Sequence, residues 1–181
     1  MAGNVMVQDV QNLVDPLKGY DFQMTISPVI GPAATTTQIL SLRCTATELP
    51  GVKIDQIPVD LAAFTLIYPG RARFSHSWTT TLVEGQDAAI ILTVLSWMKL
   101  TFNWLTGVGS NKADIQSTAQ VTMYTDPDTP IMTYSLYGLF PIADPGTPLS
   151  MAESRAVNPQ ITWSFDFFDV DQIAQQGLQS Q

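Results

Sequence analysis

Few residues of this chain have the types and spacing that catalysis requires. His76 is the only histidine. A nucleophilic triad would need it beside a serine and a carboxylate. Ser75 and Ser77 are its neighbours, but the alternation of a β-strand turns both to the opposite face. We therefore predict that His76 is a strand histidine in a polar or interfacial contact.

Metal chemistry finds equally little support in the sequence. A single cysteine and a single histidine allow neither a disulfide nor a Cys/His zinc cluster. Asp126 and Asp128 place two carboxylates in one short segment and could hold a hard cation. The segment lacks the glycine and the distal glutamate of an EF-hand loop, and its Asp-Pro pair favours a hairpin turn. No metal-binding residue is predicted.

Two other segments invite a chemical reading. Residues 107–112, Gly-Val-Gly-Ser-Asn-Lys, resemble a phosphate loop only faintly, because they follow a helical pattern and lack the Gly-Lys-Ser/Thr ending. Cys44 alternates with Leu40, Leu42 and Ala46 and is interpreted as a small buried apolar residue on their face. The sequence predicts no catalytic residue, no cofactor and no enzyme.

Composition favours a chain covered by other copies. The 181 residues fit one domain, predicted over 1–181 with an N-terminal arm at 1–19 and a flexible tail at 171–181. Hydrophobic residues make up 45% of the chain and charged residues 13%, about half the usual charged fraction of about 25%. Either the core is large for the length or much of the surface is covered by neighbours, and we favour the second.

The net charge of −8 limits the partners. An acidic chain binds nucleic-acid phosphates or an anionic membrane poorly. Acidity suits a surface past which nucleic acid must slide, although solubility is the simpler explanation.

No signal-peptide pattern is visible at the N-terminus, and the apolar run Ile90–Leu105 is interrupted by Lys99 and too short for a bilayer. We therefore expect no membrane anchor. Because a single cysteine allows no disulfide within the chain, we also expect synthesis in a reducing cytoplasm.

Strand-like alternation dominates the rest of the chain. The fold class predicted is α+β: a mainly antiparallel β-sandwich or barrel with one flanking α-helix and a long β-hairpin arm. The expected strands cover 20–27, 40–47, 52–59, 64–68, 74–84, 117–124, 131–141 and 161–168. A Pro-rich loop is expected at 143–159.

The most informative stretch is the predicted arm. A strand at 40–47 leads into the corner Glu48-Leu49-Pro50-Gly51, and a second extended run follows at 52–59. Pro69-Gly70-Arg71 is interpreted as a further turn. A hairpin with hydrophobic alternation and no cover of its own is built to pair with another chain.

One helix is predicted, from Gln86 to Leu105, with Asp87 suited to its dipole and Gly107 to its C-terminal cap. Ser96, Lys99 and Asn103 form a narrow polar stripe, and nearly every other position is apolar. A helix on one sheet needs only one apolar face. We expect it to pack on its own sheet and then on a neighbouring subunit, the alternative being a central core helix.

The order of these elements resembles the tail tube proteins of contractile-tailed bacteriophages. The resemblance covers about residues 20–170 and rests on the corner Cys44-Thr45-Ala46-Thr47-Glu48-Leu49-Pro50-Gly51, the long hairpin, the strand 75–84, the single helix with Trp97 and three closing β segments. The Pro-rich loop 143–159 departs from the simplest family members.

The resemblance implies a homohexameric ring, and rings that stack into the inner tube of the tail. It implies the following partners: a tail sheath protein around the tube, a tape-measure protein inside it during assembly, and a baseplate tube initiator. Genomic DNA would pass through the lumen without specific binding. The protein would belong to the virion tail, after assembly in the host cytoplasm.

Contact residues follow from the arm and the helix. The predicted inter-ring contacts are Glu48, Leu49, Pro50, Gly51, Val52, Ile54, Ile57 and Val59. The predicted contacts within a ring are Trp97, Lys99, Leu100 and Trp104.

Three alternatives stay open at the level of the sequence. A baseplate tube-initiator or tail-terminator ring, or a type VI secretion-like tube protein, would share these features. A β-barrel carrier of small molecules would normally be secreted, and no signal peptide is visible. An enzyme would need a cluster of reactive groups that the chain lacks.

Overall fold

A computed structural model describes residues 19–27, 39–125, 129–144, 146, 149 and 156–172. The predicted N-terminal arm, the Asp126–Asp128 turn and most of the 143–159 loop lie outside these residues. The elements with defined bounds are β1 (Phe22–Ile26), β2 (Cys44–Thr47), β3 (Val52–Leu61), β4 (Phe64–Phe74), β5 (Ser77–Leu82), α3 (Ala89–Thr101), β6 (Phe102–Asn103), β7 (Val108–Gly109), α4 (Lys112–Ile115), β8 (Ser117–Thr125), β9 (Thr129–Ala143), β10 (Gln160–Ser164) and β11 (Phe167–Gln172).

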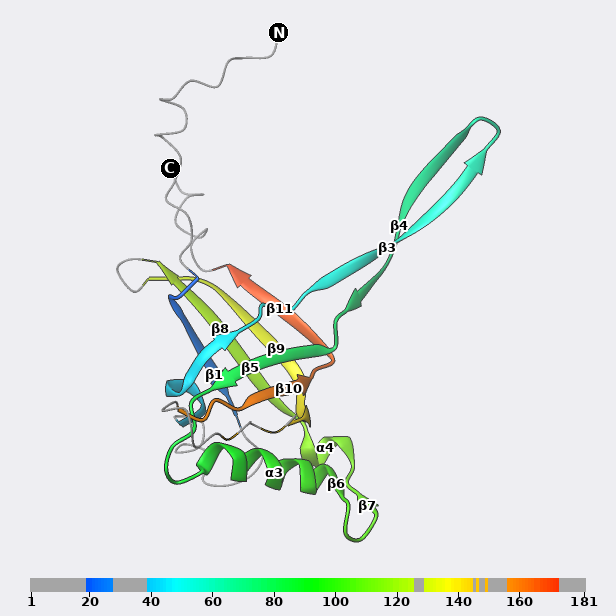
Figure 1. Ribbon diagram of the computed structural model, residues 1–181. Coiled ribbons are helices and arrows are strands. Elements are labelled where there is room, and N and C mark those ends of the chain that lie inside the picture. Colours follow the sequence, from blue (N-terminus) through cyan, green and yellow to red (C-terminus); the bar gives the residue numbers. More distant parts are fainter. Residues whose placement is uncertain are drawn as a thin grey trace, which may run out of the picture.

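The predicted fold class is confirmed, since antiparallel strands dominate and α3 flanks them (Figure 1). The main sheet has the strand order β1-β8-β9-β10-β5-β2, and β11 also pairs with β9. The long strand β9 holds β11 along residues 132–137 and β10 along 140–143. β9 therefore joins two layers, β1-β8-β9-β11 and β9-β10-β5-β2.

Between these layers and α3 lies an apolar core rich in tryptophan. Trp163 packs against Trp78 and Trp97, with ring centroids 6.5 and 5.6 Å apart. Each indole N–H has an acceptor. Trp78 donates to the Glu48 carbonyl, Trp97 donates to the Ile115 carbonyl, and Trp163 donates to the Thr80 hydroxyl. A buried indole N–H usually finds a hydrogen-bond partner, and among the described residues no buried side-chain N or O atom is left without one.

The strand predicted at 40–47 is only half right. Residues 39–42 form a helical turn, in which the Arg43 N–H donates to the Ile39 carbonyl, and the strand begins at Cys44. As a result Leu40 is buried while Leu42 is 76% exposed. A short apolar run cannot by itself distinguish a strand from a helical turn.

The arm exists, but it is not the predicted hairpin. β2 pairs with β5, and the hairpin consists of β3 and β4, which turn at Ala62 and Ala63 and project away from the sheets (Figure 1). Ala62 adopts a φ of 44°, which the primed two-residue turn requires and which an alanine does not signal. The Pro69-Gly70 pair, predicted as a turn, lies inside β4.

The helix is shorter than predicted. α3 covers 13 residues, Ala89–Thr101, because Phe102 has extended backbone and starts the small β6–β7 hairpin. Gly107 lies in that hairpin with a φ of 72° and does not cap the helix. Asp87 is outside the first turn, and the helix N-terminus receives another carboxylate, that of Glu84.

Two predicted strands are divided by corners. The run 74–84 breaks at His76, whose φ is 52°, so β4 ends at Phe74 and β5 begins at Ser77. The run 161–168 divides into β10 and β11 around Asp166. Asp171 and Gln172, predicted to belong to the flexible tail, are part of β11, and the rest of the predicted tail lies outside the described residues.

Candidate functional site

The residues considered for chemistry do not form a reactive cluster. In the described part of the chain, no group of three or more His, Cys, Asp or Glu residues is placed to hold a metal. The His76 Nδ1 lies 3.0 Å from the Phe165 carbonyl oxygen, which confirms the predicted polar contact. His76 therefore ties the corner between β4 and β5 to the end of β10.

Cys44 is half-buried, and its thiol donates a weak hydrogen bond to the Ala46 carbonyl at 3.6 Å. Burial raises the pKa of the Cys44 thiol to about 11. The predicted buried face around it is wrong in part, because Leu42 and Ala46 are exposed. Little of a thiol with so high a pKa is in the nucleophilic thiolate form at neutral pH.

The two strands of the arm carry nine exposed large hydrophobic side chains. Three cross-strand pairs lie on one side of its outer half: Ile57 with Tyr68, Val59 with Leu66, and Leu61 with Phe64. Their exposed fractions range from 38% to 76%. We call these six residues the apolar arm face.

Nothing in the described chain covers this face. An isolated two-stranded hairpin is marginal in water, and apolar side chains on it gain no burial from their own strands. Exposed apolar patches of this kind often mark protein interfaces, so the apolar arm face is a candidate interaction surface.

A second exposed apolar surface runs along α3 into the β6–β7 hairpin. Leu92, Leu95 and Leu100 lie on the outer side of α3, and Phe102 and Trp104 continue the surface. We call these five residues the helix surface.

No helix in the described residues has the length and hydropathy to cross a membrane.

A third surface is polar and crosses the layer β1-β8-β9-β11. The strand register aligns Thr25, Gln120, Ser135 and Asp169 in one row, and Gln23, Thr122, Thr133 and Asp171 in the next. The opposite side of the same strands supplies core residues such as Met24, Val121 and Leu136. We call these eight residues the polar sheet face; Ser135, which is 8% exposed, is the one buried member. The four strands contain no Lys or Arg, so its only charges are the two aspartates.

Both outer strands of this layer have a free edge within the described residues. β1 pairs only with β8, and β11 only with β9. A free edge presents unpaired N–H and C=O groups, which invite a strand from another chain.

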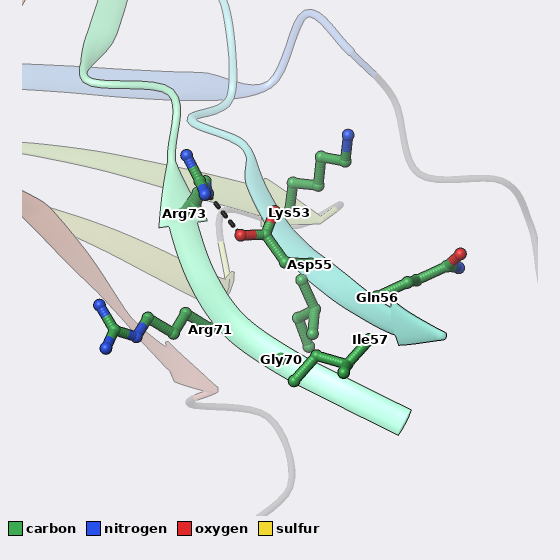
Figure 2. A pocket seen from close by; sticks show the side chains of 8 residues that line it. Lys53, Asp55, Gln56, Ile57, Gly70, Arg71 and Arg73 are labelled. Carbon is green, nitrogen blue, oxygen red and sulfur yellow. Dashed lines mark hydrogen bonds and ion pairs between the residues drawn. The ribbon is translucent and has the colours of Figure 1, made fainter. Parts of the chain in front are cut away.

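The arm is bent at its neck, where the register of β3 and β4 shifts between Ile54 and Gln56. The bulge is on β4, where Gly70 and Arg71 both lie opposite Asp55. The Asp55 carboxylate accepts a hydrogen bond from the Arg73 Nε at 2.5 Å (Figure 2). Lys53, Gly70 and Arg71 line the same hollow. The neck therefore gathers most of the charge of the arm, whose outer half has Asp60 as its one charged residue.

Most of the predicted contact residues are accessible. Glu48, Leu49, Gly51, Val52, Ile54, Ile57 and Val59 are exposed, as are Lys99, Leu100 and Trp104. Pro50 is buried, and Trp97 is fully buried in the core with its indole N–H on the Ile115 carbonyl. A fully buried tryptophan cannot contact a neighbour, so Trp97 was wrongly placed on the surface.

Sequence reasoning missed the polar sheet face. It expected a strand at 64–68 and placed the inter-ring contacts in the arm from Leu49 to Tyr68, but it did not foresee that this strand pairs with β3. The alternation of 52–68 contained the signal, since apolar residues on both strands must share one face of a ribbon.

No protein-family model matches this sequence, and no curated protein matches it. Solved structures do match the fold. A chain of the anti-feeding prophage baseplate is 7% identical with a TM-score of 0.66, over 90% of this chain and 99% of that one. A chain of the sheath–tube complex of an extracellular contractile injection system, in its extended state, is 12% identical with a TM-score of 0.61, over 93% and 99%.

A chain from the tube-terminating cap of the anti-feeding prophage is 13% identical with a TM-score of 0.64, over 93% of this chain and 99% of that one. At these identities the likeness establishes a shared fold and no more. That fold occurs in the baseplate, sheath–tube and cap structures of contractile injection systems.

Proposed function

We propose that this protein is a structural subunit whose six-membered rings stack into the inner tube of a contractile tail. The observation that carries the proposal is the apolar arm face, six large side chains on a ribbon that the described chain leaves uncovered. Fully burying one such side chain contributes about 1.5–3 kcal/mol. Docking several of them on the next ring would stabilise a stack.

The free edges of β1 and β11 would close each ring. Pairing of the β11 edge of one copy with the β1 edge of the next is a heterologous contact, which closes when the rotation per copy completes a circle. The four-stranded layers would then join into one barrel. The helix surface, with Lys99, would contribute further contacts between neighbours in the ring.

Joining these layers would place the polar sheet face on one wall of the barrel, and we assign that wall to the lumen. Hydroxyl, amide and carboxylate groups without cations would let a polyanion slide past, because no Lys or Arg holds its phosphates. This suits the ejection of phage DNA. Baseplate initiator, sheath and tape-measure proteins are the partners that such a tube requires.

A tube-initiator or terminator ring, or a type VI secretion-like tube protein, is the second candidate. The fold occurs in baseplate and cap structures as well as in a sheath–tube complex, and this supports the second candidate beside the first. Electron microscopy of the purified chain separates the two, since a tube subunit forms open-ended tubes and an initiator or terminator stops at one ring.

A matched pair of variants tests the role of the arm. Leu66 and Ile67 are adjacent, 42% and 55% exposed, and lie on opposite faces of β4. Leu66→Asp should abolish tubes, because it puts a charge in the apolar arm face, while Ile67→Asp should be far milder. Equal effects would refute the assigned face, and a monomer at high concentration in native mass spectrometry would refute the proposed function.

A further inference from the structure

The neck of the arm holds a hollow of about 540 Å³ lined by charged residues. Lys53, Arg71 and Arg73 contribute three cations and Asp55 one carboxylate, which leaves a local charge of +2. Figure 2 shows the Asp55–Arg73 pair and the charged ends of Lys53 and Arg71 turned away from it. We call these four residues the neck cluster.

The backbone holds the neck cluster in place. Asp55 has no register partner, and a Cβ at Gly70 would lie 3.0 Å from the Asp55 carbonyl oxygen. Only glycine allows this close approach without a shift. The bulge thus bends β3 against β4 and brings Asp55 beside Arg73.

The pairing of the strands is costly for a free arm. Lys53 lies directly opposite Arg73 in the register, and like charges in that position destabilise a strand pair. Asp55 offsets one cation only. Among the described residues neither Lys53 nor Arg71 takes part in an ion pair. Both cations are therefore free to bind an anion of another molecule.

The cations of the neck cluster differ from the others. The described Lys and Arg residues are Arg43, Lys53, Arg71, Arg73, Lys99 and Lys112. Arg43 pairs with Asp87 and Lys112 with Asp166. The neck therefore contains two of the three described cations that have no ion pair, on a chain whose net charge is −8.

We infer that the neck cluster binds carboxylates on the acidic surface of a second copy of this chain and so orients the stacking of copies. Two chains of charge −8 repel each other, and a cationic spot of +2 is where an approaching copy is attracted. Nucleic acid is a poorer occupant, because a few cations in an acidic field hold phosphates weakly. The inference rests on the proposed function only in requiring that copies associate.

Charge-matched variants test the inference. Lys53→Gln/Arg71→Gln lowers the net charge by two and leaves the Asp55–Arg73 pair intact. Gln86→Glu/Asn111→Asp makes the same change at two exposed positions away from the arm. In sedimentation assays, the first variant should need a protein concentration about tenfold higher, or more, before it assembles. A tenfold change is what the loss of about one interfacial ion pair would cause. The control should stay near wild type.

Zero-length carbodiimide crosslinking identifies the partner group. Assemblies of mixed ¹⁵N-labelled and unlabelled wild-type chains should give isotopically mixed peptides that join the Lys53 amine to an Asp or Glu of another copy. Folding of each variant is checked by circular dichroism. Failure of the wild type to associate would overturn the inference together with the proposed function.

Assembly that is normal in Lys53→Gln/Arg71→Gln and free of intermolecular Lys53 crosslinks would overturn the inference alone. Binding of a fluorescent single-stranded oligonucleotide by the wild type, lost in that variant, would overturn it in favour of a phosphate ligand. An equal loss of assembly in the control would also overturn it, since total charge and not the neck would then be responsible.

Discussion

At the scale of single residues, Glu84 performs the task that the sequence assigned to Asp87. Its Oε1 accepts hydrogen bonds from the Gly85 and Ile90 N–H groups, and its Oε2 accepts one from Ile91 at 2.7 Å. The Ile90 and Ile91 N–H groups belong to the first turn of α3 and have no partner within the helix, and a carboxylate there also complements the helix dipole. The side chain of Glu84 is only 5% exposed.

We expect Glu84→Gln to destabilise the unassembled chain by about 1–3 kcal/mol, because an amide cannot accept all three bonds. Urea unfolding followed by circular dichroism measures the change. Asp87→Asn is the control, because Asp87 does not bond the helix N-terminus. Its carboxylate instead forms an exposed pair with Arg43, and this hydrogen bond lowers the pKa of Asp87. If Asp87→Asn cost as much as Glu84→Gln, Glu84 would not be the helix cap.

Cys44 supplies a pH-dependent prediction. With a pKa of about 11 against an ordinary 9.0, its thiolate fraction at pH 8 falls by about a hundredfold. Alkylation by iodoacetamide should be slower by that factor in the folded chain than in urea. The folded state keeps its proton longer, so the stability contributed by this group is full below pH 9 and is lost as the pH rises towards 11. Equal alkylation rates in both states would contradict the burial of Cys44.

At the scale of elements, β9 is the strand that holds both layers, and it bends at Gly138. Gly138 has a φ of 72°, and a Cβ there would overlap the Asp166 carboxylate. Asp166 occupies the corner between β10 and β11 and pairs with Lys112 of α4. One glycine thus lets β9, the corner and α4 meet.

Gly138→Ala should cost more than the roughly 1–2 kcal/mol of left-handed backbone alone, because Asp166 must also move and strain its pair with Lys112. Gly107→Ala is the matched control: its φ is also 72°, and nothing lies within 4 Å of the added Cβ. The difference between the two melting temperatures measures the contribution of the close approach. Equal shifts would show that backbone conformation alone is responsible.

At the scale of the whole molecule, the surfaces divide by chemistry. The apolar arm face, the helix surface and the polar sheet face lie on different elements, and only the first two have the apolar character of an interface. The described chain exposes two apolar surfaces and the free edges of β1 and β11, and the proposed rings and tube would cover all of them. These surfaces together, and not one motif, support the proposed assembly.

The lumen assignment is tested on assembled tubes. Gln120→Lys adds a cation to the polar sheet face, and repetition around each ring would multiply it. Such tubes should retain labelled duplex DNA at low salt and release it as salt screens the charge. Gln86→Lys makes the same change outside that face, in the loop before α3. If Gln86→Lys tubes retained as much DNA, the polar sheet face would not be the wall of the lumen.

The sequence by itself determined which side chains alternate into the core. Within the strands predicted at 20–27, 74–84 and 161–168, alternation puts Met24 with Ile26, Trp78 with Leu82, and Ile161 with Trp163 on the same face, and all six are buried. Alternation is a local property, because successive Cβ atoms in a strand point to opposite faces whatever the strand pairs with.

Only the tertiary structure decided where strands end and which strands pair. The turn at Ala62 and the corner at His76 have positive φ without a glycine. The end of α3 at Phe102 carries no sequence signal either. Such conformations are held by partners distant in the chain, as when β2 pairs with β5 instead of β3. Local propensity cannot contain the free energy of contacts that form only when the chain is folded.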